Sequence, residues 1–532
     1  MSRTLRRITI VLVVPLGWIG CFSNGSGGNG PGPQFDGSFD GTEFDTSVPE
    51  SSVDTSVAEA AADAVVDARV DATMDATAEA TVDAGVPVVV TVVGAGGPEP
   101  GVIIVYDDAT GAYVATQTTD ANGRASRVVA AGSTVTALLG DPAVYVSPFT
   151  IMGVQPGDAL TVVDWESLPS TDQGTRAECT SVSVTEQAAP LANTSTYLAS
   201  SGLIANQTGS LPVPVSLGGQ CAAGFQLAGP PGTIELGASI TAGQPTFPML
   251  LEAFDSTNTP LGYLFKNGNA LPTPADGGDA ATESLALAGA WSTNYWTQTV
   301  NITNVPDGGQ TFTPILSEVV SGTLTTNPFQ GTGVSTFWTH PGFADFVQVE
   351  ASTSVYFLSG LAMATALPAP TASATINLDL TPLASMPVLS GTSVDTTNPT
   401  RPAFGWTTSS GSLSTVTGIV VFATFGGAGG DGGSTAGNWT IVAPATSQTS
   451  VQAPELPASL SGWTAASTGF ANGNLEVWGL QGSALPNYAA VRAAASTFKE
   501  QPACAIYAPL VPALPAVGTS LMVTMWSNAI CS

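Results

Sequence analysis

Two runs of sequence, VVVTVV at residues 88–93 and GVIIVY at residues 101–106, decide the fold class of this chain. They consist mainly of β-branched residues, which favour extended strands. Turn signals follow them, because DDATG at residues 107–111 and TTDANG at residues 118–123 place Asp or Asn shortly before a Gly. Such a Gly can take the positive φ that hairpin turns require. The pattern predicts a small antiparallel β-sandwich.

The same region carries a family resemblance. PGV at 100–102, the turn at 108–111, TTDANGRA at 118–125 and AGS at 131–133 resemble a carboxypeptidase regulatory-like or Cna B-type domain. The resemblance covers residues 87–162 and implies a spacer or support, with no catalytic role. Some relatives carry Lys–Asn isopeptide crosslinks, but this segment contains no Lys.

Short β-prone runs continue through residues 163–387, among them TVNIT at 299–303 and FVQVE at 346–350. Closely spaced Gly, Pro and Asn separate these runs, which is typical of a sandwich or a barrel. The region is long enough for one large domain or two smaller ones, and both readings remain open.

The C-terminal region, residues 388–532, begins with the segment NPTRPAFGW at 398–406 and includes APELP at 453–457. These segments resemble the entry strand and a strand-linking segment of a fibronectin type III-like sandwich. The resemblance places Tyr488 on a later strand. We therefore predict an all-β chain of tandem antiparallel, Ig-like or prealbumin-like β-sandwiches.

The N-terminus has the pattern of a signal peptide over residues 1–20, in which Arg3, Arg6 and Arg7 precede an uncharged run at residues 8–19. That run is too short to span a bilayer. WIGC at residues 18–21 resembles a bacterial lipobox, although Trp18 stands where an aliphatic residue is usual. The resemblance implies that Cys21 carries the lipid; the alternative is a chance Cys after an ordinary signal.

Residues 21–86 form a predicted disordered acidic linker. Acidic residues recur there every four positions, at Asp63, Asp67, Asp71, Asp75, Glu79 and Asp83. On a helix these like charges would stack and repel, so disorder is favoured. We interpret the linker as a stalk, or alternatively as filler of no special length. An acidic tether after a lipobox resembles surface lipoproteins of large-genome Gram-negative bacteria, which implies attachment to the outer membrane at the cell surface.

The cysteine count agrees with a lipidated Cys21. The chain has five Cys, so removing Cys21 leaves an even number in an oxidising compartment. Pairing of Cys179 with Cys221 and of Cys504 with Cys531 is the simplest of the three possible connectivities. No metal-ligand spacing occurs among them.

Charge and composition limit the partners. Only 10% of residues are charged, and the formal net charge is −29. Nucleic acids and anionic lipid surfaces require a basic footprint, so neither is expected as a partner. Membrane contact is predicted through the N-terminal lipid only, and no motif implies a cofactor.

Few residues suggest a site. His340 is the only histidine, so His-dependent nucleophile activation is excluded unless His340 itself is the base. An isolated His before Pro341 is typical of a loop or a packed position. Trp291, Trp296 and Trp338 are candidates for stacking against a sugar ring, the alternative being that they fill the core.

These observations favour a non-enzymatic cell-surface lipoprotein that is structural or binds a polysaccharide or protein through its sandwiches. The alternative is an extracellular carbohydrate-active hydrolase that uses paired carboxylates in residues 163–387, because glycoside hydrolysis needs two carboxyl groups and no histidine. No catalytic residue is predicted.

Overall fold

A computed structural model describes the chain from residue 85 to residue 527 with internal gaps. The described residues are 85–94, 97–141, 145–164, 179–186, 191–200, 225–227, 232–237, 246–257, 259–270, 283–287, 290–306, 311–326, 335–353, 359–398, 401–425, 436–463, 474–498 and 511–527. They form strands almost throughout, which confirms the all-β prediction. The predicted signal peptide and acidic linker lie outside them, apart from the linker's last two residues.

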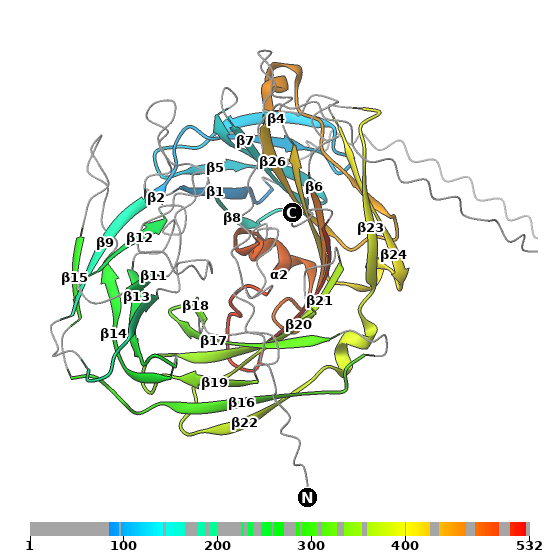
Figure 1. The fold of residues 1–532 in the computed structure, drawn as a ribbon. Helices are drawn as coiled ribbons and strands as arrows, with labels where there is room; N and C mark the ends of the chain where they lie inside the picture. The colour runs from blue at the N-terminus through cyan, green and yellow to red at the C-terminus, as the bar shows by residue number, and fades with distance from the viewer. Residues whose placement is uncertain are drawn as a thin grey trace, which may run out of the picture. The chain divides into compact units, whose positions relative to one another are not determined.

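A twelve-stranded sheet organises the fold (Figure 1). Its strands, in spatial order, are β18 (Thr323–Thr326), β17 (Phe312–Val320), β20 (Phe346–Thr353), β21 (Ser359–Pro368), β29 (Ser520–Ser527), β28 (Leu475–Gln481), β25 (Gly418–Phe425), β26 (Ala436–Pro444), β7 (Tyr145–Val154), β6 (Ser133–Asp141), β3 (Ile103–Asp107) and β4 (Tyr113–Thr118). Neighbouring strands are antiparallel except β26 and β7, which run parallel.

The central strands of this sheet are buried on both faces. Successive side chains of a strand point to opposite faces, and in β25 Ile419 and Val421 enter one hydrophobic core while Val420 and Phe422 enter another. A strand covered on both sides needs apolar residues at nearly every position. This requirement explains the continuous run GIVVFATF in β25.

Two three-stranded sheets cover the first face. They are β19 (Thr336–Thr339), β16 (Trp296–Thr303) and β22 (Ala374–Asp379), and then β23 (Val388–Asp395), β24 (Ala403–Ser410) and β27 (Ser450–Gln452). Val300, Phe337 and Leu378 of the first sheet join the same core as Leu316 and Val349 of the large sheet. This packing produces one β-sandwich.

A four-stranded sheet and a helix cover the second face. The elements are β2 (Gly97–Pro98), β1 (Val88–Gly94), β5 (Arg124–Arg127), β8 (Ala159–Val163) and α2 (Tyr488–Ala493). Alternate residues of β1, namely Val88, Val90 and Val92, are fully buried against this core. The packing of β1 on the large sheet produces a second sandwich.

Two further sheets come from the middle of the chain. One contains β11 (Phe225–Leu227), β10 (Thr196–Ser200), β13 (Thr246–Phe254) and β14 (Pro260–Ala270). The other contains β12 (Gly232–Gly237), β9 (Cys179–Glu186) and β15 (Glu283–Leu287). Short 3₁₀ turns occur at η1 (Thr381–Ser385), η2 (Leu413–Thr415), η3 (Ala458–Trp463) and η5 (Ala495–Thr497). Among the described helices, none has the length and apolar character needed to cross a membrane.

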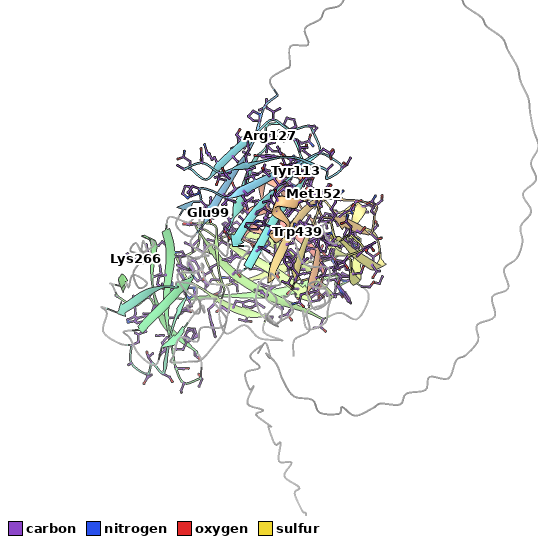
Figure 2. All side chains as sticks on the ribbon, turned by 90° about the horizontal axis from the view of Figure 1, so that it is seen from above. Glu99, Tyr113, Arg127, Met152, Lys266 and Trp439 are labelled. Carbon is purple, nitrogen blue, oxygen red and sulfur yellow. The ribbon has the colours of Figure 1, made fainter. Side chains whose placement is uncertain are left out.

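Strand pairing crosses both boundaries that the sequence suggested at 162/163 and 387/388. β7 of the first region pairs with β26 of the last, with Thr440 opposite Phe149 and Val442 opposite Ile151. β21 of the middle region pairs with β29 near the C-terminus. Residues far apart in sequence therefore share one sheet, and Ala84–Cys531 form one compact unit. Figure 2 labels Met152 and Trp439 where β7 and β26 meet.

Buried polar contacts surround this β7–β26 junction. The indole Nε1 of Trp439 donates to Thr150 Oγ1 at 2.9 Å, and Thr150 Oγ1 lies 2.9 Å from Thr136 Oγ1. The hydroxyl of Tyr488 lies 2.8 Å from the carbonyl oxygen of Met152 and 3.1 Å from that of Val442, so it bridges the two strands. These contacts satisfy groups that would otherwise be desolvated without partners.

Tyr488 corrects one sequence prediction, because it begins α2 and does not lie on a strand. The side chain of Asn487 accepts a hydrogen bond from the amide of Ala490 at 3.0 Å and so caps the helix. The following sequence YAAVRA contains strong helix formers. On the same helix, Arg492 forms a bidentate ion pair with Asp158, at 2.8 Å from Nε and 3.2 Å from Nη2.

Both predicted turns of the first region form, but only the turn between β3 and β4 is a hairpin, because the turn after β4 leads to β5, which pairs with β1 in another sheet. The Oδ1 atom of Asp108 accepts from the amides of Thr110 and Ala112, and Gly111 has a φ of 77°. Asp120 accepts in the same way from the amide of Asn122, and Gly123 has a φ of 68°. At both turns the Asp side chain closes the loop and the Gly supplies the left-handed conformation.

Candidate functional site

His340 lies in a buried cluster of ionisable side chains. It follows directly after β19, whereas Glu252 comes from β13 and Glu318 from β17. All three are almost inaccessible, with exposed fractions of 4% for His340, 1% for Glu252 and 4% for Glu318. We call these three residues the His340 cluster. It joins three different sheets of the fold.

Each ring nitrogen of His340 faces a carboxylate. Nε2 lies 2.8 Å from Glu252 Oε1, and Nδ1 bonds Glu318 Oε2. The backbone amide of His340 also donates to Glu318 Oε1 at 2.8 Å. The imidazolium form has a hydrogen on both ring nitrogens and so can donate to both carboxylates. Burial alone lowers the pKa of His340, but the two glutamates outweigh it and raise the pKa to about 10.

Aromatic rings enclose the imidazolium. The ring centroids of Tyr263, Tyr295 and Phe343 lie 4.8, 5.4 and 6.0 Å from that of His340, all in edge-to-face orientation. The hydroxyl of Tyr263 donates to the carbonyl of Pro341 at 3.2 Å and so fixes the loop that carries His340. Burial, followed by the charge of Glu252, raises the pKa of Tyr295, whose hydroxyl is buried without a hydrogen-bond partner.

This arrangement suits a structural role better than catalysis. A general acid or base must reach a proton of the substrate, but both ring nitrogens already bond carboxylates inside the protein. Removing the cation from such a buried charge network is strongly destabilising, because it leaves the carboxylates uncompensated. The His340 cluster therefore connects β13 to β17 and to the loop after β19.

Sequence reasoning placed His340 in a loop or a packed position but did not find its two partners. Glu252 and Glu318 are separated from His340 by 88 and 22 positions. A local signal exists, because each is the one charged residue in an otherwise uncharged strand, TFPMLLEAF in β13 and FTPILSEVV in β17. Such a residue on a buried strand requires a partner.

The three tryptophans considered for sugar stacking do not share one surface. Trp296 of β16 pairs with Thr339 of β19, while Trp338 pairs with Thr297. Paired residues project on the same face and successive residues on opposite faces, so Trp296 and Trp338 point away from each other. Trp291 packs against Gly262 of β14, where an added Cβ would lie 3.4 Å from its ring. All three side chains are half-buried.

The cysteine predictions fall on residues that cannot be assessed. Cys21, Cys221, Cys504 and Cys531 lie outside the described residues, and of Cys179 only its place at the start of β9 is described. Within the described ranges, no three His, Cys, Asp or Glu side chains are grouped so as to hold a metal ion.

Asp107 of β3 is a second buried ionisable group with a contrasting environment. Its side chain is 1% exposed, and neither carboxylate oxygen has a hydrogen-bond partner. Burial raises the pKa of Asp107 to about 7, and the charges of Asp108 and Glu455 add to the rise while that of Arg401 opposes it. Arg401 instead donates to the carbonyl oxygens of Thr110 and Ala453, at 3.0 and 3.3 Å.

Comparisons with known proteins do not assign the chain to a family. No protein-family model matches the chain, and no curated protein matches it. Among solved structures, the Bacillus anthracis TIE protein is similar over 56% of this chain and 50% of its own, with 9% identity and a TM-score of 0.13. An ice-binding, Ca²⁺-stabilised adhesin of an Antarctic bacterium is similar over 75% of this chain and 95% of its own, with 12% identity and a TM-score of 0.11.

Proposed function

We propose that this chain is a non-enzymatic, lipid-anchored cell-surface protein whose β-sandwich body serves a structural or ligand-binding role. The anchor in this proposal is Cys21, and the acidic residues 21–86 hold the body away from the outer membrane of a Gram-negative bacterium. Support for the anchor comes from the sequence: the Arg-rich start, the WIGC segment and the long acidic tract. Support for the non-enzymatic role comes from the fold.

The observation that carries the proposal is that Glu252 and Glu318, the best candidates for paired catalytic carboxylates, bond His340 inside the protein. A glycosidase needs two carboxyl groups that flank a bound sugar. The middle region does bring two carboxylates together, Glu252 and Glu318, but both bond His340 and are almost fully buried. A substrate cannot reach carboxylates that are buried and already hydrogen-bonded to His340. This pair therefore argues for a scaffold and against the hydrolase alternative.

Turnover assays test the non-enzymatic part. Purified full-length protein is incubated with a panel of polysaccharides and the release of reducing ends is measured. We expect no release above the buffer control. Release that is lost in the Glu252→Gln and Glu318→Gln variants would overturn the proposal and establish the hydrolase.

Cell fractionation tests the anchoring part. Cys21→Ser should move the protein from the membrane fraction to the soluble fraction, because a single lipid would be its only attachment. Mass spectrometry of the mature N-terminus should show a lipidated Cys21 in the wild type. Continued membrane attachment of the Cys21→Ser variant would contradict the lipid anchor.

A further inference from the structure

The sheet β19–β16–β22 has one apolar face and one polar face. Its apolar face, with Val300, Phe337 and Leu378, packs into the core beside β17 and β20, and Figure 1 shows β16 and β22 along the side of the fold that carries β17. Its opposite face is polar, with Asn301, Thr336 and Asn377 exposed and the other side chains half-buried. We call the following residues the outer polar face: Thr297, Thr299 and Asn301 of β16, Thr336 and Trp338 of β19, and Asn377 of β22.

Strand register brings these side chains together. Thr299 lies opposite Thr336, with hydroxyl oxygens 3.5 Å apart, and Thr297 lies opposite Trp338. On the other side of β16, Asn301 lies opposite Asn377 and its Nδ2 donates to Asn377 Oδ1 at 3.0 Å. That bond leaves the Oδ1 of Asn301 and the amide hydrogens of Asn377 for a ligand, since each amide side chain has both donors and acceptors.

The outer polar face carries no positive charge. The strands WTQTVNIT, TFWT and ATINLD contain neither Lys nor Arg. The one carboxylate on them, Asp379, already accepts from Asn304 Nδ2 at 2.9 Å and from the amide and hydroxyl of Thr381 at 2.9 and 2.7 Å. The surface thus presents neutral hydroxyl and amide groups around the half-buried indole of Trp338.

We infer that the outer polar face binds a neutral polysaccharide. An indole ring offers a flat apolar surface of the kind that stacks on rings, and the Thr hydroxyls and Asn amides can donate to and accept from sugar hydroxyls. Charge favours a neutral glycan over an anionic one. The chain has a formal net charge of −29 and the outer polar face has no cation, so an anionic polymer would be repelled. This inference rests on the proposed non-enzymatic role and names its ligand class.

Other occupants fit this face less well. A protein partner is expected to bury a desolvated apolar centre, whereas five of the six residues of the outer polar face are Thr or Asn. Nucleic acids and anionic lipids require Lys or Arg, which these strands lack. A neutral polymer of hydroxyl groups matches the surface in both charge and hydrogen bonding.

Affinity electrophoresis of the purified full-length protein in gels with neutral or anionic soluble polysaccharides tests the inference. We expect retardation by at least one neutral glucan, xylan or mannan. Trp338→Ala should weaken that binding about tenfold, and Asn301→Ala combined with Asn377→Ala severalfold, while Trp338→Phe keeps a ring and most of the affinity. Tyr113→Ala is the matched control, because Tyr113 is an exposed aromatic residue on β4 of a different sheet and should leave binding unchanged.

Three results would overturn the inference: no retardation by any neutral polysaccharide, unchanged binding in both Trp338→Ala and the double Asn variant, or preferential binding of anionic polymers. Thermal unfolding of each variant distinguishes loss of binding from loss of fold, and the double Asn variant at exposed positions keeps the test valid if Trp338→Ala unfolds. Assaying the same samples for reducing ends separates this inference from the proposed function. Turnover would overturn the non-enzymatic role, whereas absent binding without turnover would overturn the polysaccharide site alone.

Discussion

The β7–β26 junction and the His340 cluster both connect segments that are distant in sequence, but they use different forces. The junction relies on backbone pairing between two strands and on neutral hydrogen bonds from Trp439 and Tyr488. The His340 cluster relies on a buried cation between two carboxylates. A neutral connection has the same strength at every pH, whereas an ionic one depends on the protonation of its members.

The two connections also differ in what their loss leaves behind. Deleting the indole at the junction leaves a cavity, while the Thr150 hydroxyl keeps its contact with Thr136. Deleting the imidazolium leaves two carboxylates facing each other in a site that excludes water, which is far less favourable. The comparison implies that the neutral connection tolerates conservative substitution and that the ionic one tolerates it only at a carboxylate.

Raising the pH should produce the largest effect. The pKa of His340 is raised from 6.5 to about 10, so the folded chain keeps a proton that the unfolded chain releases above pH 6.5. This stabilisation is complete below pH 6.5 and is lost as the pH rises to about 10. Between pH 7 and pH 10 the free energy of unfolding should fall by about 4 kcal/mol through this group. Urea unfolding across that range measures it.

Substituting His340 should remove that pH dependence. We expect His340→Gln to lower the free energy of unfolding at pH 7 by about 3 to 4 kcal/mol, because it leaves two buried carboxylates without their cation. Glu252→Gln is the matched variant. It should change stability by under about 1 kcal/mol, since the imidazolium keeps Glu318 and the cluster loses its excess negative charge. Equal losses in the two variants would contradict this charge balance.

At the junction, Trp439→Ala should lower the free energy of unfolding by about 3 kcal/mol, because its fully buried ring fills space between β7 and β24. Trp439→Phe should lose only about 1 kcal/mol, since most of the ring volume remains. Neither variant should change the slope of stability against pH between 7 and 10. A changed slope would show that a group which titrates between pH 7 and pH 10 contributes to the stability of the junction.

Asp107→Asn should have a smaller effect of the opposite sign. The raised pKa means that the folded chain holds a proton on Asp107 between about pH 4 and pH 7, so stability falls as the pH rises through that window. At pH 8 the Asn variant should be about 2 kcal/mol more stable than the wild type, because it removes a buried carboxylate that lacks hydrogen bonds. This advantage should shrink as the pH falls to 4, because the wild type then holds a proton on Asp107 and gains stability.

Asp108→Asn is the control for that prediction. The carboxylate of Asp108 accepts hydrogen bonds from two amides and a hydroxyl, and these bonds lower its pKa. Asp108→Asn should therefore destabilise the protein at pH 8, where Asp107→Asn stabilises it. Destabilisation by both variants would indicate that Asp107 has an interaction with its surroundings that favours its charged form.

Local sequence predicted local structure well. The β-branched run at residues 88–93 forms β1, and the Asp and Gly residues of the two turns take the conformations expected of them. Pairing between distant strands was not predictable. Strands that pair within one region and strands that pair across regions, such as β7 and β26, have a similar apolar character. The hydrophobic pattern of a strand indicates which of its faces are buried, but it does not determine which other strand pairs with it.

The candidate sites show the same limit. The sequence singled out His340 and Trp338 by residue type, but their surroundings depend on residues distant in sequence. His340 contacts Glu252 and Glu318 from two other sheets, and Trp338 has Thr297 as its cross-strand neighbour. The prediction that Tyr488 lies on a strand was wrong for a local reason. Its position after Asn487 and before an Ala-rich run is a helix start, which the assumed fibronectin-like strand order concealed.

We expect the first, middle and last regions to unfold as one cooperative unit around the twelve-stranded sheet. Native-state hydrogen exchange, read by mass spectrometry on peptides from β6 and β7, from β20 and β21, and from β26 and β28, measures this cooperativity. The slowest amides in all three sets should open with the same free energy, equal to that of global unfolding. A lower opening free energy confined to β6 and β7 would show that residues 87–162 unfold as a separate domain and would contradict it.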